Sequence, residues 1–302
     1  MTAIYLQLAV CALLPGVVPT GTFVLAASAA ATAAAPPAVA ITVVSTTSTE
    51  NSGLMDALLP AFTADTGIRV RLISVGTGQA LRIGRNGDAD ALLVHHPRSE
   101  LEFVAAGFGV DRRPVMVNDF VLVGPAADPA GVGGLSDAAA ALERIADRRA
   151  GFVSRGDDSG THAKERELWA AAGIDPSAVG RAWYRETGSG QGATLNVASA
   201  QSAYALTDRA TWLNFGNKGE LTLLVEGDPR LRNLYSAIRV NPARHPHVES
   251  AGARAFVEWL ASDRGQRLIA DYRIAGRQAF YPAAADCGGR GECEAAAAAA
   301  TP

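Results

Sequence analysis

Short runs of β-forming residues alternate with stretches of helical periodicity along most of the chain. An apolar run at 40–44 leads into five hydroxyl-bearing residues, and Leu54, Leu58 and Phe62 then recur at helical spacing, with Pro60 expected to kink or divide the helix. At 68–75 apolar and arginine residues alternate, as in a strand, before a glycine-rich turn. This order of strand, turn and helix predicts an α/β protein whose ligand lies at the carboxyl ends of the strands.

The alternation is interrupted at 124–134, where two prolines and four glycines fall together. Such a segment predicts a boundary between two lobes. The pattern on either side predicts further strands at 91–94, 114–123, 152–153, 204–206, 221–225 and 235–240, and helices at 98–106, 136–148, 163–172, 248–261 and 265–272.

The amino-terminal part differs from the rest, because residues 1–40 contain no charged side chain and end in an alanine-rich run. This composition indicates an export leader, and its prolines and glycines leave no apolar span of about 20 residues that would anchor the chain in a membrane. The expected organisation is an export leader at 1–40, the first part of lobe 1 at 41–123, lobe 2 at 124–228, a return to lobe 1 at 229–283 and a flexible tail at 284–302.

Composition narrows the class of protein. With 48% hydrophobic and 19% charged residues the chain resembles a globular protein, and its net charge of -3 offers no basic field for nucleic acid. We expect a monomer. In the tail, Cys287 and Cys293 have a spacing that permits a disulfide in an exported chain without establishing one.

Hydroxyl groups and glycines cluster at three places where a strand gives way to a helix, namely 45–49, 76–78 and 154–162. The first turn of a helix presents unpaired N–H groups, and Ser or Thr adds an O–H donor beside them, so each segment could bind an anion. Ser and Thr are also ordinary helix N-caps, which leaves plain capping as the alternative for any one segment. Three such segments in one chain favour anion binding.

Arg155 is the sharpest candidate ligand, because a guanidinium offers paired donors that match an oxyanion. The alternative is that Arg155 forms a surface ion pair with its neighbour Asp157 or Asp158. Ion pairing and ligand binding can both hold if a carboxylate orients the arginine while the ligand takes its remaining donors. We expect Asp157 to turn toward Arg155, while Asp158 faces solvent or caps the following helix.

A series of segments, in order over 41–282, carries a more specific signal than any single motif. The segments are TTSTENSGL at 46–54, VGTGQAL at 75–81, GRNGDAD at 84–90, NDF at 118–120, SRGDDSGTH at 154–162, WY at 183–184, GATLN at 192–196, LTDR at 206–209 and EGDP at 226–229. Together they resemble the tungstate-binding proteins of bacterial tungstate ABC transporters. The resemblance implies a type II periplasmic-binding-protein fold, in which two α/β lobes close on a ligand in the cleft between them.

The resemblance also implies an exported solute-binding protein, periplasmic or extracellular, that captures tungstate or molybdate for the membrane permease of an ABC importer. Four binding groups carry over from it: Thr47, Ser48, Arg155 and Thr161. We extend the expected site to four further positions: Thr77, Ser159, Gly190 and Thr194.

Two alternatives remain open. Phosphate-binding proteins of the same fold carry a similar Arg-x-Asp-x-Ser-Gly-Thr pattern, which 155–161 also satisfies. A hydrolase is the alternative from another class, but none of the five histidines has the i, i+4 spacing of a helical zinc site, and no serine lies in a G-x-S-x-G elbow. We therefore expect no catalysis, no bound metal and no cofactor.

Overall fold

The computed structural model describes residues 39–176, 178 and 182–284, so residues 1–38 of the expected leader, most of the tail and both of its cysteines lie outside the described residues. The helices are α1 (Thr47–Asn51), α2 (Leu54–Thr66), α3 (Thr77–Asn86), α4 (Pro97–Ala105), α5 (Ala138–Asp147), α6 (Gly160–Ala171), α7 (Gln191–Gln201), α8 (Arg209–Asn214), α9 (Ser250–Ala261) and α10 (Asp263–Asp271), with a 3-10 turn η1 at Pro229–Leu231. The strands are β1 (Ala40–Thr46), β2 (Arg69–Val75), β3 (Ala91–Val94), β4 (Gly109–Pro125), β5 (Phe152–Ser154), β6 (Tyr184–Glu186), β7 (Ala205–Asp208), β8 (Leu221–Val225), β9 (Arg232–Val240), β10 (Arg273–Ile274), β11 (Arg277–Gln278) and β12 (Tyr281–Pro282). These elements confirm the α/β class.

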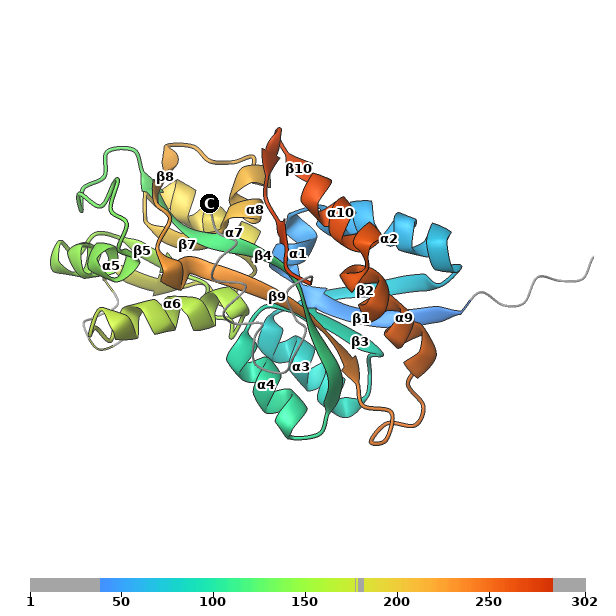
Figure 1. Ribbon diagram of the computed structural model, residues 1–302. Helices are drawn as coiled ribbons and strands as arrows, with labels where there is room; N and C mark the ends of the chain where they lie inside the picture. The colour runs from blue at the N-terminus through green and yellow to red at the C-terminus, as the bar shows by residue number, and fades with distance from the viewer. Residues whose placement is uncertain (1–38, 177, 179–181, 285–302) are drawn as a thin grey trace, which may run out of the picture. The chain divides into compact units, whose positions relative to one another are not determined.

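The main sheet has the strand order β12-β4-β9-β3-β1-β2, and β7 and β8 also pair with β4. β1 is parallel to β2 and β3, whereas β9 is antiparallel to both β3 and β4. The early residues of β4 pair with β9, and its late residues, 120–125, pair with β7 and β8. β4 and β9 therefore run side by side between two groups of helices (Figure 1).

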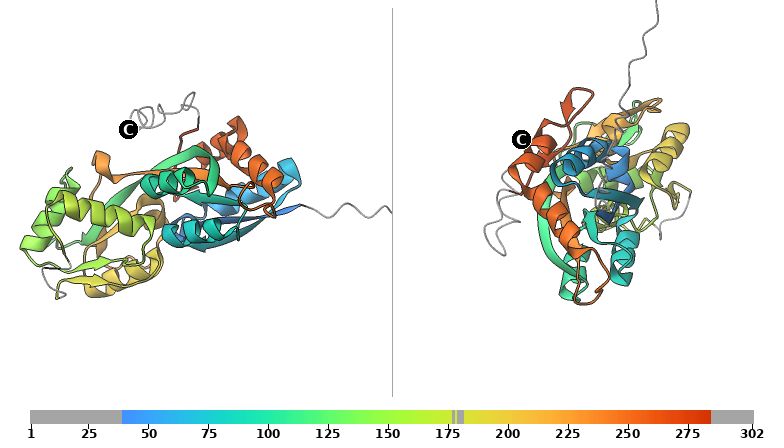
Figure 2. Two further views of the ribbon diagram at one scale, coloured as in Figure 1. Left: turned by 90° about the horizontal axis from the view of Figure 1, so that it is seen from below. Right: turned by 90° about the vertical axis from the view of Figure 1, so that its right-hand side faces the viewer.

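The first lobe packs helices on both faces of its strands. Val43 of β1 belongs to the same buried cluster as Phe62 of α2, whereas Val44 clusters with Leu81 of α3 and Phe103 of α4. Successive side chains of a strand point to opposite faces, so one strand serves two layers. Figure 2 shows these helix layers from two further directions.

The second lobe has its own core, built within residues 120–231. Trp169 of α6 is 1% exposed and makes edge contacts with Phe152 of β5 and with Trp183. The core of each lobe and the paired strands β4 and β9 that join them give the two-lobe architecture that the sequence predicts, and Ala210 of α8 packs into the core of the first lobe.

Several elements differ in extent from the prediction, and α2 and β4 illustrate the reasons. α2 continues through Pro60 from Leu54 to Thr66, although proline removes one backbone hydrogen bond. Leu58 and Phe62 are both buried, and their packing on either side of Pro60 holds the helix together. β4 begins at Gly109, five residues earlier than expected, because β9 pairs with it from Val240 onward.

Candidate anion-binding site

The residues predicted for the site lie in loops that follow strands, at or near the amino ends of helices. Thr47 and Ser48 open α1, Thr77 opens α3, Arg155 follows β5, Ser159 and Thr161 lie at the start of α6, and Gly190 and Thr194 lie at the start of α7. The helices α1 and α3 belong to the first lobe, and α6 and α7 belong to the second. The predicted residues therefore come from both lobes.

Direct hydrogen bonds hold the two lobes together beside these residues. The backbone N–H of Gly78 donates to the carbonyl oxygen of Asp158 over 3.3 Å. The amide nitrogen Nδ2 of Asn214 donates to the carbonyl oxygen of Asn51 over 2.7 Å. Both bonds cross from one lobe to the other, so the lobes meet in the structure.

Arg155 is 2% exposed and links the lobes through its side chain. Its Nη2 donates to Oγ1 of Thr47 over 3.3 Å and to the carboxylate of Asp157, and its Nη1 lies 3.5 Å from Oε1 of Gln191. Its Nε has no hydrogen-bond partner within the described part of the chain. Asp157 thus turns toward Arg155 and Asp158 is exposed, as the sequence predicts.

Four of the predicted hydroxyl groups remain able to donate a hydrogen bond, among them that of Thr47, which accepts from Arg155 and keeps its own hydrogen. Oγ1 of Thr77 and Oγ1 of Thr161 are buried, and neither has a partner among the residues that the structure describes. Oγ of Ser159 accepts the N–H of His162 over 3.2 Å as the N-cap of α6, which leaves its own hydrogen available. Buried donors without partners are rare, so the threonines mark a place where a ligand would fit.

The other hydroxyl groups are engaged within the protein. Oγ of Ser48 lies 3.1 Å from Nε2 of His95, and Oγ1 of Thr194 lies 3.2 Å from the carbonyl oxygen of Gly190. Oγ1 of Thr194 also lies 2.9 Å from Oγ1 of Thr187, a residue that the sequence did not single out. For Ser48 and Thr194 the hydroxyl has a structural partner.

A buried chain of hydrogen bonds crosses between the lobes beside Ser48. Nδ1 of His95 lies 2.9 Å from Oδ1 of Asn233, whose Nδ2 donates to Oδ1 of Asn118 over 2.8 Å. Nδ2 of Asn118 in turn lies 3.4 Å from Oδ1 of Asp208. The asparagines face each other across β4 and β9, His95 follows β3, and Asp208 ends β7.

These bonds fix which nitrogen of His95 carries the proton. Burial lowers the pKa of His95 to about 3, so the imidazole is neutral. Because Asn233 uses its Nδ2 to donate to Asn118, its oxygen accepts from Nδ1–H of His95. Nε2 of His95 then accepts the hydroxyl hydrogen of Ser48.

Similarity to known proteins identifies the family of this chain. A profile of the PBP superfamily domain matches residues 31–264. The tungstate-binding protein TupA of Peptoclostridium acidaminophilum is 47% identical over 234 residues, which cover 77% of this chain and 81% of that protein. The chain belongs to the tungstate-binding protein family.

Two further members of the tungstate-binding protein family agree with this assignment. TupA of Campylobacter jejuni is 38% identical over 237 residues, covering 77% of this chain and 87% of that protein. The solved structure of TupA from Desulfovibrio alaskensis G20 has a TM-score of 0.70 at 49% identity, covering 81% of this chain and 99% of that chain. These matches confirm the two-lobe periplasmic-binding-protein fold.

Two buried acids lie near the site in this member of the tungstate-binding protein family. Burial raises the pKa of Glu165 to about 7, although Tyr184 and Trp169 donate hydrogen bonds to its Oε1. Burial likewise raises the pKa of Asp208, while the positive charge of Arg155 opposes that rise. Sequence reasoning missed both acids because an isolated Asp or Glu carries no signal of its burial.

No group of three or more His, Cys, Asp or Glu side chains in the described residues is placed to hold a metal ion. None of the helices that the structure describes is long and apolar enough to cross a membrane.

Proposed function

We propose that this chain is an exported binding protein that captures tungstate, and also molybdate, for the membrane permease of an ABC importer. The observation that carries the proposal is a set of buried donors without partners within the described residues, contributed by both lobes: Nε of Arg155, Oγ1 of Thr77 and Oγ1 of Thr161. A tetrahedral dianion accepts hydrogen bonds on every side. Donors from both lobes can therefore bind the same ion, and the bound ion links the two lobes. The names of the relatives at 38% to 47% identity support the same ligand.

The amino ends of helices add to this set of donors. α3, α6 and α7 begin at Thr77, Gly160 and Gln191, and their first N–H groups carry a partial positive charge. We keep all eight predicted positions as the proposed site, with the main contributions from the groups that are free to donate. For Ser48, Gly190 and Thr194 we propose contributions through the backbone or through the neighbours that they position.

The proposed role needs neither catalysis nor a cofactor, and we propose a monomer that is exported and does not bind nucleic acid. We also propose the lobe boundaries expected from the sequence, with lobe 1 at 41–123 and 229–283 and lobe 2 at 124–228. The separate hydrophobic cores support this division, because the core of the second lobe lies within 120–231.

Titration with four oxyanions tests the proposed ligand. At pH 7 tungstate and molybdate are unprotonated dianions of similar size, and we expect both to bind more tightly than phosphate and the smaller sulfate. A protonated oxyanion in a site of donors leaves its own hydrogen unpaired, at a cost of about 1 to 3 kcal/mol. Calorimetric titration decides the matter: tighter binding of phosphate would replace tungstate as the ligand, and binding of none of the four would overturn the proposed class.

Gly160 gives a test of lobe contact at a residue that has no side-chain donor of its own. A Cβ at this position would lie 2.8 Å from Cε1 of His95 and 3.1 Å from Oγ1 of Thr77, both in the other lobe. Gly160→Ala should therefore oppose closure, with an overpacking cost of about 1 to 3 kcal/mol. The expected result is a loss of tungstate affinity of roughly 5- to 150-fold in calorimetry.

Gly192→Ala is the matched control for this variant. Gly192 also lies in the first turn of a helix of the second lobe, but a Cβ there would come no closer than 3.9 Å to Nδ2 of Asn51. Its tungstate affinity should stay near that of the wild type. Equal affinities of the two variants would show that the contact at Gly160 does not limit closure.

A further inference from the structure

The charges buried around the proposed site do not balance when a dianion is added. Arg155 supplies one positive charge at 2% exposure, and Asp157, whose side chain is 14% exposed, already pairs with it. Asp208 is fully buried beside them, and the charge of Arg155 acts on it. A dianion next to two carboxylates and one guanidinium would leave several negative charges together in a region of low dielectric, which is strongly unfavourable.

The two oxygens of Asp208 have different surroundings. Oδ1 accepts the backbone N–H of Thr211 over 2.9 Å as the N-cap of α8, and it is the oxygen nearest to Nδ2 of Asn118. Oδ2 is buried and has no partner among the described residues. A buried carboxylate oxygen without a donor is a poor place for negative charge and a good place for a proton.

Asp208 is also tied to the proposed site by short connections. Thr211, which it caps, has its hydroxyl 3.4 Å from the carbonyl oxygen of Ser48. On the other side, Gln191 connects Arg155 with the strand that ends at Asp208. Its Oε1 faces Nη1 of Arg155, and its Nε2 donates to the carbonyl oxygen of Leu206. The residues next to Asp208 along the chain are thus linked to groups of both lobes.

Two titratable groups close to Asp208, Tyr235 and His95, are neutral. Tyr235 of β9 has its pKa raised well above its ordinary value by burial and by the charge of Asp208 itself. His95, at the end of β3, is neutral because burial lowers its pKa to about 3. Arg209, the next residue along the chain, is paired with Asp119 and Glu226. Arg155, paired with Asp157, is the charged group that acts on Asp208.

We propose that the protein takes up one proton from solvent, at Oδ2 of Asp208, when it binds a divalent oxyanion. The inference rests on the proposed function and deepens it, because it gives the site a second means of matching charge besides Arg155. The carboxylate becomes a neutral carboxyl group, and the proton comes from water or buffer without any other reactant. The bound form then holds the dianion beside Arg155 and a neutral Asp208.

Calorimetry with sodium tungstate between pH 6.5 and 9, in pairs of buffers with different ionisation enthalpies, measures the proton uptake directly. We expect an uptake that rises with pH toward one proton per tungstate, and an affinity that falls by up to tenfold per pH unit where free Asp208 is ionised. Asp208→Asn keeps an oxygen for Thr211 and places a neutral amide at the position of Oδ2. Its binding should show no proton uptake, and its affinity should equal or exceed that of the wild type at pH 9.

Glu165→Gln is the matched control, because it neutralises another fully buried acid in the same lobe. This variant should keep the proton uptake and pH dependence of the wild type. Three results would overturn the inference and leave the proposed function intact. They are tungstate binding without proton uptake, a pH dependence that persists in Asp208→Asn, and a pH dependence that disappears in Glu165→Gln. Absence of tungstate binding by the wild type at every pH would overturn both.

Discussion

Arg155→Ala should lower the affinity for tungstate by roughly 10²- to 10⁴-fold. A guanidinium can donate two parallel hydrogen bonds to an oxyanion, and each bond to a charged group contributes about 1.5 to 3 kcal/mol. In the structure Nε of Arg155 is buried without a partner in the described residues, and Nη2 is oriented by Asp157 and Thr47. The substitution also leaves Asp157 without its counterion next to the bound dianion, which adds to the loss.

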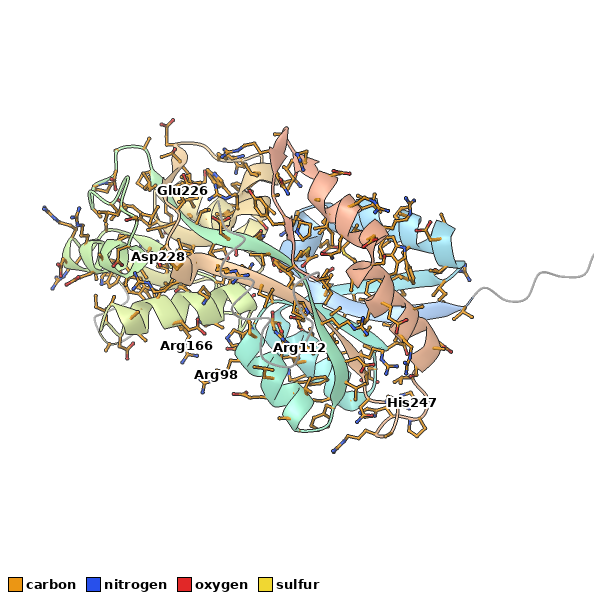
Figure 3. All side chains as sticks on the ribbon, viewed as in Figure 1. Arg98, Arg112, Arg166, Glu226, Asp228 and His247 are labelled. Atoms are coloured by element: carbon orange, nitrogen blue, oxygen red, sulfur yellow. The ribbon has the colours of Figure 1, made fainter. Side chains whose placement is uncertain are left out.

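Arg166→Ala is the control for the general loss of a positive charge. Arg166 is exposed on α6, the helix that begins with Gly160 (Figure 3). It lines a pocket together with Thr77 and Ser159, so it is a positive charge near the site that remains in contact with solvent. Its removal should change the affinity less than threefold, since exposed charges are screened by solvent and salt. Thr77→Val and Thr161→Val should each cost about tenfold. Wild-type affinity for Arg155→Ala in calorimetry, with the fold checked by circular dichroism, would contradict the assigned role.

Glu165→Gln should change how stability depends on pH, by up to about 3 kcal/mol. Burial raises the pKa of Glu165 from 4.5 to about 7, a difference that corresponds to this free energy. Below pH 4.5 the carboxyl is protonated in the folded and the unfolded chain. Between pH 4.5 and 7 the unfolded chain releases the proton while the folded chain keeps it, so the wild type loses stability as the pH rises.

Denaturant unfolding of both proteins at pH 4.5 and pH 8 measures this effect. Glutamine does not titrate, so the free energy of unfolding of the variant minus that of the wild type should become more positive at the higher pH. All other titrating groups are shared by the two proteins and cancel in the difference. A difference that is the same at both pH values would show that Glu165 titrates normally in the folded protein.

The sequence predicts the fold and the hydroxyl-rich turns well, because both depend on local pattern. The turn at 76–78 and the segment 154–162 lie at the ends of β2 and β5, as the alternation of apolar and polar residues predicts. The pairing of Arg155 with Asp157 was also predictable, since two residues of separation bring the side chains within reach. The expectation that Pro60 divides its helix is wrong, because burial of its neighbours outweighs the local cost of proline in a helix.

The buried network between the lobes could not be predicted from pattern. Asn118 and Asn233 are 115 residues apart, and only the antiparallel register of β4 and β9 brings them face to face. The capping alternative also needed the structure, because it holds for Thr46 and Ser159, the N-caps of α1 and α6, and fails for the hydroxyls of Thr77 and Thr161. The sequence identifies the residue types, whereas only the three-dimensional structure shows which hydroxyl groups already have hydrogen-bond partners.

The strand order has a consequence for how the chain folds as it is made. β9 lies between β4 and β3, so the sheet of the first lobe stays in two pieces until residues 232–240 are available. The second lobe, by contrast, is a continuous stretch with its own core within 120–231. During synthesis the chain can therefore complete its second lobe first. The lobe that contains the first strands of the chain is the last to form.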